Sequence, residues 1–428
     1  MEDTKINNLN REYLLCTSPT ERDKKSETFC MLPWVHMNFM PDSSVIPCCF
    51  APFGESFGNA KENSIQEIWN SEKYKELRKQ MLEGKKSGSC NVCYKMEESN
   101  ISSMRNHVNK EFADEFSIVE TTQEDGAVEN VNLSYFDVRF SNICNFKCRG
   151  CSETLSSAWH EDHEKLYNYK SGKDKVISCT EGGTNSLWDQ LVTFIPKIKK
   201  AYFAGGEPLL IEEHYKTLQI LLDHGRNDVP LAYNTNLSVL KLKNYDLIKL
   251  WNSFSDISLM VSIDDIEERG EYYRKGTNWV KLINNWDYIK EKCPHIRFSI
   301  TCTVNVMNVF YLPEIYMLFV KNNYIQSYNF GFNVLLYPEV YRIQVLPKKF
   351  KDKLTEKLLA SVDKFRTELM PGINHDHYHS NILSTLNFLE KEDHSWQLEE
   401  FKKRTNKLDE IRGEDFKKIY PELAELLD

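Results

Sequence analysis

The sequence of 428 residues has no apolar run that approaches the roughly 18 residues needed to cross a bilayer. From Met1 to Lys25 it is polar and charged, without the apolar stretch of a signal peptide. Positive charge is not in excess either, because 54 Lys and Arg stand against 63 Asp and Glu, a formal net charge of −9. Nucleic acid and membrane partners are therefore not expected, since phosphate backbones require neutralising cations. We predict a cytoplasmic protein.

Cysteine, in contrast, is abundant, with twelve residues. In a reducing compartment, clustered cysteines bind metal or perform chemistry more often than they form disulfides. Five lie between positions 30 and 93, and three lie close together about fifty residues later. The remaining four stand alone, and we interpret them as buried small side chains: Cys16, Cys179, Cys293 and Cys302.

The chain is too long for one small domain, and its composition changes along its length. We interpret residues 1–28 as a polar arm, 29–98 as a cysteine-rich module, 99–130 as a linker or solvated helix, 131–345 as an α/β core and 346–428 as a helical, charged region. Within the module, helical spacing of apolar residues predicts one helix over 64–82, capped by Asn63 or Ser64.

In the core, short β-rich runs alternate with amphipathic helical runs, which is typical of a parallel sheet covered by helices. The predicted strands are 132–140, 200–204, 230–235, 256–263, 296–304 and 327–335. The predicted helices are 152–169, 186–197, 211–225, 240–252, 277–291 and 311–323. Six β–α units indicate a partial barrel rather than the eight of a closed one.

The strongest local motif is Cys144-Asn-Phe-Lys-Cys148-Arg-Gly-Cys151, directly after the first of these strands. Three thiolates at this spacing can ligate three irons of a [4Fe–4S] cluster and leave the fourth iron without a protein ligand. A structural zinc site is the alternative, but zinc usually takes four protein ligands, and no close fourth is evident.

This loop, placed after the first strand of six β–α units, resembles the radical S-adenosylmethionine (SAM) superfamily. The resemblance covers residues 131 to about 335. Gly205-Gly206-Glu207-Pro208 follows the second strand, where the family has a loop that receives the methionine amino group of SAM. Two glycines allow close backbone approach, and a carboxylate can accept a hydrogen bond from a cation.

The resemblance also suggests SAM contacts at the ends of later strands. Asn234 and Asn236 follow the third strand, where family members hold the ribose hydroxyls; Ser262 and Asp264 end the fourth. Arg274 stands where related enzymes pair an arginine with the SAM carboxylate, which suits a bidentate guanidinium. Each also has an ordinary alternative, as a turn asparagine, a capping Asp or a surface Arg.

One position departs from the family pattern, which commonly has an aromatic residue before the third cysteine, near adenine. Here that residue is Gly150, so the adenine contacts are open, with Phe146 as one candidate.

In the N-terminal module, Cys30, Cys48, Cys90 and Cys93 have the spacing C-x17-C-x41-C-x2-C. The segment resembles a twitch domain, the shortened form of the SPASM module, which holds an auxiliary [4Fe–4S] cluster and usually follows the barrel. Four thiolates complete such a cluster without SAM. Structural zinc is again the alternative. Cys49 can replace Cys48 as the second ligand, but we prefer Cys48.

The resemblance implies a radical SAM enzyme that cleaves SAM reductively to a 5′-deoxyadenosyl radical and abstracts a hydrogen atom from its substrate. It also implies an external one-electron reductant, such as flavodoxin or ferredoxin, and an oxidised peptide or small molecule as product. A non-catalytic iron–sulfur electron-transfer or binding protein is the alternative. No catalytic residue beyond these cofactor contacts is evident from the sequence.

Overall fold

The computed structural model describes residues 26–52, 54–98, 102–170, 172, 174–182, 186–370 and 372–428. Most of the polar arm predicted at 1–28, including Cys16, lies outside these residues. The chain divides into two compact units, one holding residues up to Ser141, Ile177–Gly205 and Glu213–Leu231, the other holding the remainder. Among the described residues, no helix has the length and apolar character that a bilayer crossing requires.

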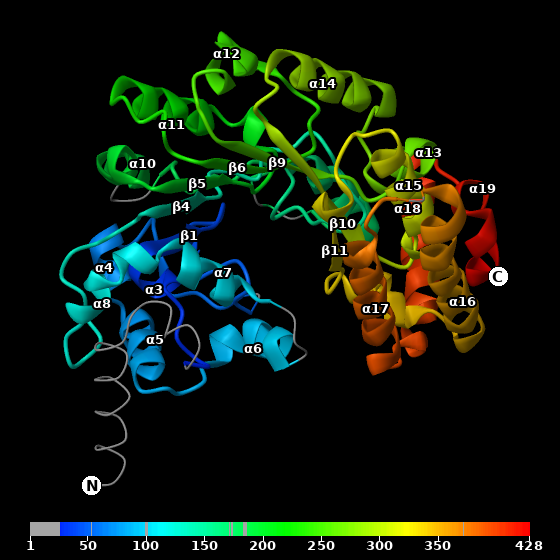
Figure 1. Cartoon of the computed structure of the whole chain (residues 1–428), viewed down its shortest axis with the longest axis horizontal. Helices are drawn as coiled ribbons and strands as arrows, with labels where there is room; N and C mark the ends of the chain where they lie inside the picture. The colour runs from blue at the N-terminus through cyan, green and yellow to red at the C-terminus, as the bar shows by residue number, and fades with distance from the viewer. Residues whose placement is uncertain are drawn as a thin grey trace, which may run out of the picture. The chain divides into compact units, whose positions relative to one another are not determined.

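Unit 1 combines the cysteine-rich segment with the first two strands of the predicted core (Figure 1). Its elements are α3 (Leu32–Val35), β1 (His36–Phe39), β2 (Ser44–Ile46), β3 (Gly58–Asn59), α4 (Ile65–Trp69), α5 (Glu72–Leu82), α6 (Asn91–Glu98), α7 (Met104–Glu111), α8 (Ser117–Glu120), β4 (Tyr135–Val138), α10 (Leu187–Phe194), β5 (Lys200–Phe203) and most of α11 (Glu212–Asp223).

The sheet of unit 1 runs in the order β5-β4-β1-β2-β3. β1 pairs in parallel with β4, with His36 opposite Tyr135 and Phe39 opposite Val138, and β4 pairs in parallel with β5. β2 and β3 continue the sheet as antiparallel strands. All residues of β1 and β4 are buried, so the cysteine-rich segment contributes a central strand to this sheet.

The helix predicted over 64–82 is two helices, which corrects that prediction. Ser64 caps α4 in a capping box with Glu67, and Ser71 caps α5 by accepting from the Tyr74 amide. Between them, the Asn70 side chain bonds to the backbone of residue 128. In the segment expected as a linker, α7 and α8 carry buried Val108 and Val119.

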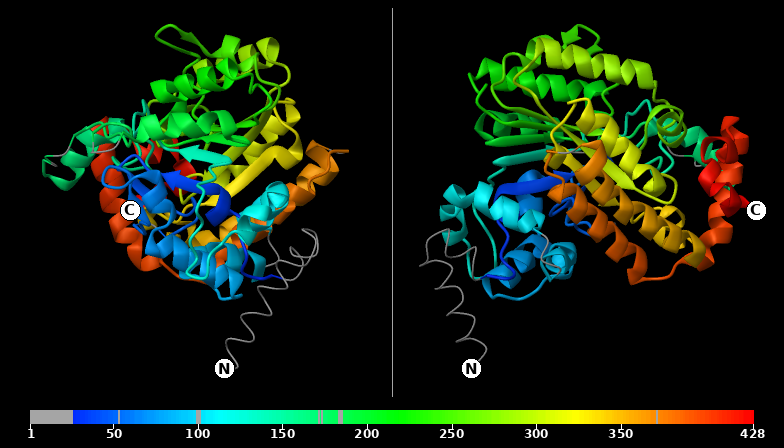
Figure 2. Two further views of the ribbon diagram at one scale, coloured as in Figure 1. Left: turned by 90° about the vertical axis from the view of Figure 1, so that its left-hand side faces the viewer. Right: turned by 45° about the vertical axis from the view of Figure 1, so that its right-hand side comes forward.

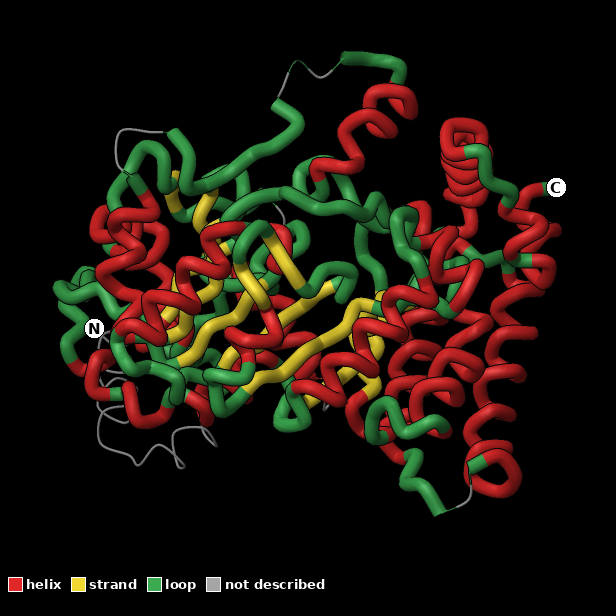
Figure 3. Tube along the Cα trace, turned by 90° about the horizontal axis from the view of Figure 1, so that it is seen from above, coloured by secondary structure: helices red, strands yellow, loops and turns green. Residues whose placement is uncertain are grey.

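Unit 2 holds the other four core strands and the C-terminal helices, which are drawn in orange and red in Figure 2. Figure 3 shows its strands in yellow and all helices in red. Its elements are α9 (His160–Tyr167), β6 (Leu231–Thr235), β7 (Lys241–Leu242), β8 (Tyr245–Asp246), α12 (Leu247–Trp251), β9 (Ile257–Ser262), α13 (Glu267–Tyr273), α14 (Trp279–Lys292), β10 (Arg297–Val304), α15 (Leu312–Lys321), β11 (Phe330–Val334), α16 (Lys348–Lys364), α17 (Asp376–Lys391), α18 (Leu398–Arg412) and α19 (Phe416–Ile419).

The strands of unit 2 lie in the order β11-β10-β9-β6, and β10 is parallel to both of its neighbours. Strict alternation along β9 buries Ile257, Leu259 and Val261, as expected for a strand with one face on the core. Trp286 of α14 stacks on Phe298 of β10 at 4.8 Å and covers this face. The α/β class and the six predicted β–α units are confirmed.

Two predicted helices are shorter than expected. The helix predicted at 152–169 begins only at His160, because Ser156 and Ser157 bond to the preceding loop instead. The helix predicted at 240–252 begins at Leu247, after the β7–β8 hairpin, and Asp246 caps it. The single cysteines Cys179, Cys293 and Cys302 are buried, as expected.

Candidate functional site

The cysteine loop follows β4, and hydrogen bonds from other segments hold several of its backbone groups. The amides of Lys147 and Arg149 donate to the carbonyls of Lys275 and Tyr273, each at 2.8 Å. The Cys148 carbonyl accepts from the indole of Trp159 at 2.7 Å. Since buried backbone groups need partners, these bonds fix the path of the loop in advance of any ligand.

The three thiols of this loop are half-buried and interact with one another. Burial raises the pKa of Cys144 and of Cys151, and the neighbouring cysteines add to this effect, so that both values reach about 12. Burial also raises the pKa of Cys148, against the opposing effect of Arg274. Thiols that resist ionisation in this way become thiolates when a metal centre supplies the compensating positive charge.

The Gly205–Pro208 segment passes against the backbone of the cysteine loop. The Glu207 amide donates to the Ile143 carbonyl at 2.8 Å. A Cβ atom at Gly206 would lie 2.2 Å from the same carbonyl oxygen, so only glycine fits there. Gly205 has φ +121°, which also favours glycine, and Pro208 begins a 3-10 turn.

The Glu207 carboxylate, which is 1% exposed, binds the end of β6. It accepts from the Thr235 hydroxyl at 2.6 Å, the Asn236 amide at 2.7 Å and the Leu209 amide at 3.1 Å. Burial raises its pKa to about 7, although these bonds act in the opposite direction. A cation at this carboxylate would therefore be strongly stabilised.

The two asparagines at the end of β6 differ in their contacts. Asn236 is buried, and its amide nitrogen donates to the Asn145 side chain of the cysteine loop at 3.0 Å. The Oδ1 atom of Asn234 is buried and has no hydrogen-bond partner among the described residues. Such an orphaned acceptor fits a ligand donor, and a ribose hydroxyl is one.

Arg274 forms an ion pair with Asp264, with 2.8 Å between Nη1 and Oδ2. The other oxygen of Asp264 accepts from the Thr303 amide at 2.7 Å, so this carboxylate orients Arg274. Arg274 lowers the pKa of all three loop thiols, which places its charge beside them. Its Nε is buried without a partner among the described residues. Ser262, at the end of β9, is half-buried.

Tyr273 explains the glycine that replaces the expected aromatic residue before the third cysteine. A Cβ atom at Gly150 would lie 2.4 Å from the Tyr273 hydroxyl. Tyr273 is 1% exposed, so it cannot move aside into solvent. Phe146 is buried as well, at 2% exposure.

In unit 1, four cysteines separated by up to 63 positions lie close together. Burial, and after it Cys93, raises the pKa of Cys90 to about 11. Burial and then Cys90 raise the pKa of Cys30. Burial and then Cys49 raise the pKa of Cys48, and Cys30 and Cys90 raise it further. The structure thus gathers the four cysteines that the spacing predicts as ligands.

Cys49 has different neighbours from Cys48. The residue as a whole is exposed, but its thiol is surrounded by other groups. Burial of this thiol raises the pKa of Cys49 to about 11; the charge of Asp137 adds to the effect, and Arg139 acts in the opposite direction. His36, in β1, is 2% exposed and stacks on Tyr135 at 4.7 Å, as expected of a packing histidine.

Both cysteine groups consist of thiols, the ligands that iron–sulfur clusters use. Among the residues that the structure describes, no three His, Cys, Asp or Glu side chains converge closely enough to hold one ion. Zinc requires its thiolates at about 2.3 Å from one centre, whereas a [4Fe–4S] cluster distributes them over separate irons.

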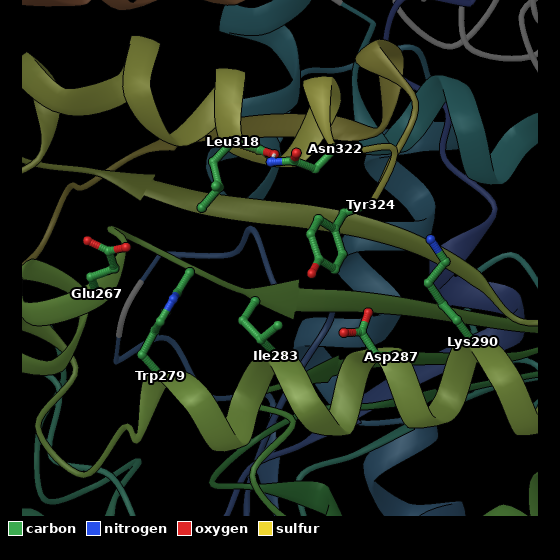
Figure 4. Close-up of a pocket in the computed structure, with 8 residues that line it drawn as sticks. All are labelled: Glu267, Trp279, Ile283, Asp287, Lys290, Leu318, Asn322 and Tyr324. Atoms are coloured by element: carbon green, nitrogen blue, oxygen red, sulfur yellow. Dashed lines mark hydrogen bonds between the residues drawn. The ribbon is translucent and has the colours of Figure 1, made fainter.

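A separate groove of about 370 Å³ lies between α14 and α15 (Figure 4). Trp279, Ile283 and Asp287 point into it from α14, opposite Leu318 and Tyr324. It includes none of the predicted site residues.

Comparison with known protein families identifies the cysteine-rich segment. Residues 30–94 match the SPASM iron–sulfur cluster-binding domain. This SPASM segment begins at Cys30 and includes Cys48, Cys90 and Cys93. It confirms the prediction of a SPASM-like cluster domain that precedes the core strands. No curated protein matches the chain significantly.

Solved structures match the chain at low identity. The structure of anSMEcpe with bound AdoMet and Cp18Cys peptide is 16% identical, with a TM-score of 0.37, over 54% of this chain and 59% of that one. Streptococcus suis SuiB bound to precursor peptide SuiA is 12% identical, with a TM-score of 0.38, over 65% and 60%. The chain thus spans about three fifths of each of these proteins.

Several residues that shape the site escaped the sequence analysis. Trp159, Tyr273 and Arg412 contact the cysteine loop from positions with no motif of their own. One signal was present in the sequence: Arg149 is a charged residue inside the cysteine motif, and the structure buries it fully.

Proposed function

We propose that the chain is a radical SAM enzyme with an N-terminal SPASM domain. The observation that carries this proposal is the convergence of three cysteines, a glycine-rich turn, a buried carboxylate and an arginine in unit 2. The carboxylate of Glu207 and the thiol of Cys144 interact electrostatically, and the charge of Arg274 acts on both. A purely structural or electron-carrying cluster has no need for a paired anion and cation beside it.

Each residue has a role in this proposal. Cys144, Cys148 and Cys151 hold a [4Fe–4S] cluster with one open iron. Glu207 and the Gly205–Gly206 backbone receive the methionine amino group of SAM, and Arg274, oriented by Asp264, receives its carboxylate. Asn234 and Asn236 lie where the ribose hydroxyls would be held. We assign Ser262 a weaker contact at the end of β9.

When bound and reduced, the cluster supplies the electron that cleaves SAM to methionine and a 5′-deoxyadenosyl radical. The chain positions SAM and excludes water from the reacting atoms, since the groups around the three thiols are buried. A hydrogen atom is then taken from a peptide or small-molecule substrate, and an external one-electron reductant restores the cycle.

The SPASM domain holds an auxiliary [4Fe–4S] cluster through Cys30, Cys48, Cys90 and Cys93 in this proposal. With all four ligands supplied by protein, it has no open iron for SAM. A cluster held by these cysteines would be able to take up the single electron left on the substrate and pass it to an external acceptor, and the overall reaction would then be an oxidation of the substrate.

The proposal is tested by 5′-deoxyadenosine release from the anaerobically reconstituted chain with SAM and a strong reductant. We expect slow release from the wild type without substrate and none from a Cys144→Ala/Cys148→Ala/Cys151→Ala variant. That variant should retain the iron and sulfide of the SPASM domain. A wild type with fully reconstituted clusters that releases no 5′-deoxyadenosine would favour a non-catalytic iron–sulfur protein.

A further inference from the structure

A buried arginine joins the cysteine loop to the C-terminal helix α18. Arg149, within the cysteine motif, has no exposed surface. Its Nη2 donates to Asp409 at 2.5 Å and to Glu414 at 2.6 Å. Its guanidinium lies 3.9 Å from the ring centre of Tyr272, whose hydroxyl also donates to Asp409, at 2.7 Å. Both carboxylates come from positions about 260 residues further along the chain.

A second arginine makes the reciprocal contact, from α18 to the loop. Arg412, whose side chain is fully buried, donates to the Lys147 carbonyl at 2.8 Å and to Asp162 at 2.7 Å. The Lys147 ammonium bonds to the other oxygen of Asp162, at 2.7 Å. Arg412 also lies 4.8 Å from the ring of Trp159, which donates to the next carbonyl of the loop. Successive loop carbonyls are thus held by one cluster of side chains.

The end of α18 is shaped to present these side chains together. The helix ends at Gly413, which has φ +65°, and the Glu414 amide then turns back to the Asp409 carbonyl at 3.0 Å. The Asp409 carboxylate also accepts at 2.7 Å from the amide of Phe416, the first residue of α19. Asp409 therefore links the helix end, the following turn and Arg149.

We propose that Asp409, Arg412 and Glu414 are positioning residues for the cysteine loop, and that this helix end sets the placement of Cys148 and thereby the affinity for SAM. The reason is that a fully buried guanidinium left without its carboxylates must either draw in water or move. Arg149 can move only with the loop that contains Cys148 and Cys151. The placement of the loop does not depend on the proposed function. Only the expected effect on SAM affinity rests on the proposed function.

Asp409→Asn/Glu414→Gln in the full, reconstituted chain tests the proposal, because it leaves Arg149 charged and removes the negative charges of its two partners. Glu410→Gln is the matched control: it lies on the same helix, and its ion pair with Lys407 is exposed. We expect hydrogen exchange at the Lys147 and Arg149 amides to become at least tenfold faster in the double variant only. We also expect its KM for SAM in 5′-deoxyadenosine formation to rise about tenfold, with a smaller change in kcat.

A lowered melting temperature with unchanged exchange at these two amides and an unchanged KM for SAM would overturn the proposal, because this result is what an ion pair with a purely structural role would give. If the double variant does not fold, Glu414→Gln, which retains Asp409, decides by the same exchange measurement. If the wild type forms no 5′-deoxyadenosine, the proposed function fails, yet faster exchange in the variant still supports the positioning role.

Discussion

Replacing Glu207 by Gln separates the charge of this residue from its size. The carboxylate accepts three hydrogen bonds in the structure, from Thr235, Asn236 and Leu209. A carboxylate offers about four acceptor directions, so one remains for the amino group of SAM. Glu207→Ala would remove the three internal bonds as well, whereas Gln retains one acceptor oxygen and the side-chain volume.

The size of the effect follows from the bond that is lost. A hydrogen bond to a charged partner contributes about 1.5–3 kcal/mol. We therefore expect the dissociation constant for SAM to rise by about tenfold to 150-fold in Glu207→Gln. The burial of Glu207, at 1% exposure, leaves little solvent to replace the lost partner and favours the upper part of that range.

The assay is an anaerobic titration of SAM into the reconstituted chain, with Thr235→Val as the matched variant. This substitution removes the 2.6 Å bond to Glu207 but leaves the carboxylate charged. We expect it to change SAM affinity only a few-fold. An unchanged affinity in Glu207→Gln, or an equal loss in both variants, would refute the assignment of Glu207 as the acceptor for the SAM amino group.

Three further outcomes are expected. Burial raises the pKa of Glu207 from 4.5 to about 7, so the native state holds a proton that the unfolded chain releases, and this contribution to stability is lost as pH rises through 7. Since the ionised carboxylate is the better acceptor for the amino group, SAM affinity measured by titration should rise from pH 6 to 8 in the wild type but not in Glu207→Gln. Cys90→Ala/Cys93→Ala should stop product formation while 5′-deoxyadenosine release continues; normal product yield from a variant shown to lack the second cluster would leave the SPASM cysteines a structural role. Gly150→Ala should lower the free energy of unfolding by about 1–3 kcal/mol, since its Cβ would meet Tyr273 at 2.4 Å. Tyr273→Phe in the same chain should recover part of this loss in thermal unfolding. No recovery would show that the loop relaxes without contact between the two residues.

The strands of the core were predictable because their signals are local. Alternating burial along β9 and β10 is written directly in their apolar residues. The residues at strand ends, such as Asn234 and Asp264, could be proposed because parallel strands bring their carboxyl ends to one edge. The cysteine spacing likewise needs no knowledge of tertiary structure.

What the sequence could not reveal depends on contacts between distant residues. Nothing near Arg149 indicates that its partners are Asp409 and Glu414. The parallel pairing of β1 with β4 joins positions 99 residues apart and has no local pattern. The break between α4 and α5 at Asn70 likewise arises from its bonds to residue 128.

The most direct test of the central claim is electron–nuclear double resonance of the reduced, reconstituted chain, with an isotopic label on the amino nitrogen of SAM. We predict a coupling between the labelled nitrogen and a cluster in the wild type. The coupling should be absent from the Cys144→Ala/Cys148→Ala/Cys151→Ala variant, which retains the SPASM cysteines. SAM bound to the wild type without any such coupling would contradict the assignment of the cysteine loop as the site where SAM meets an open iron.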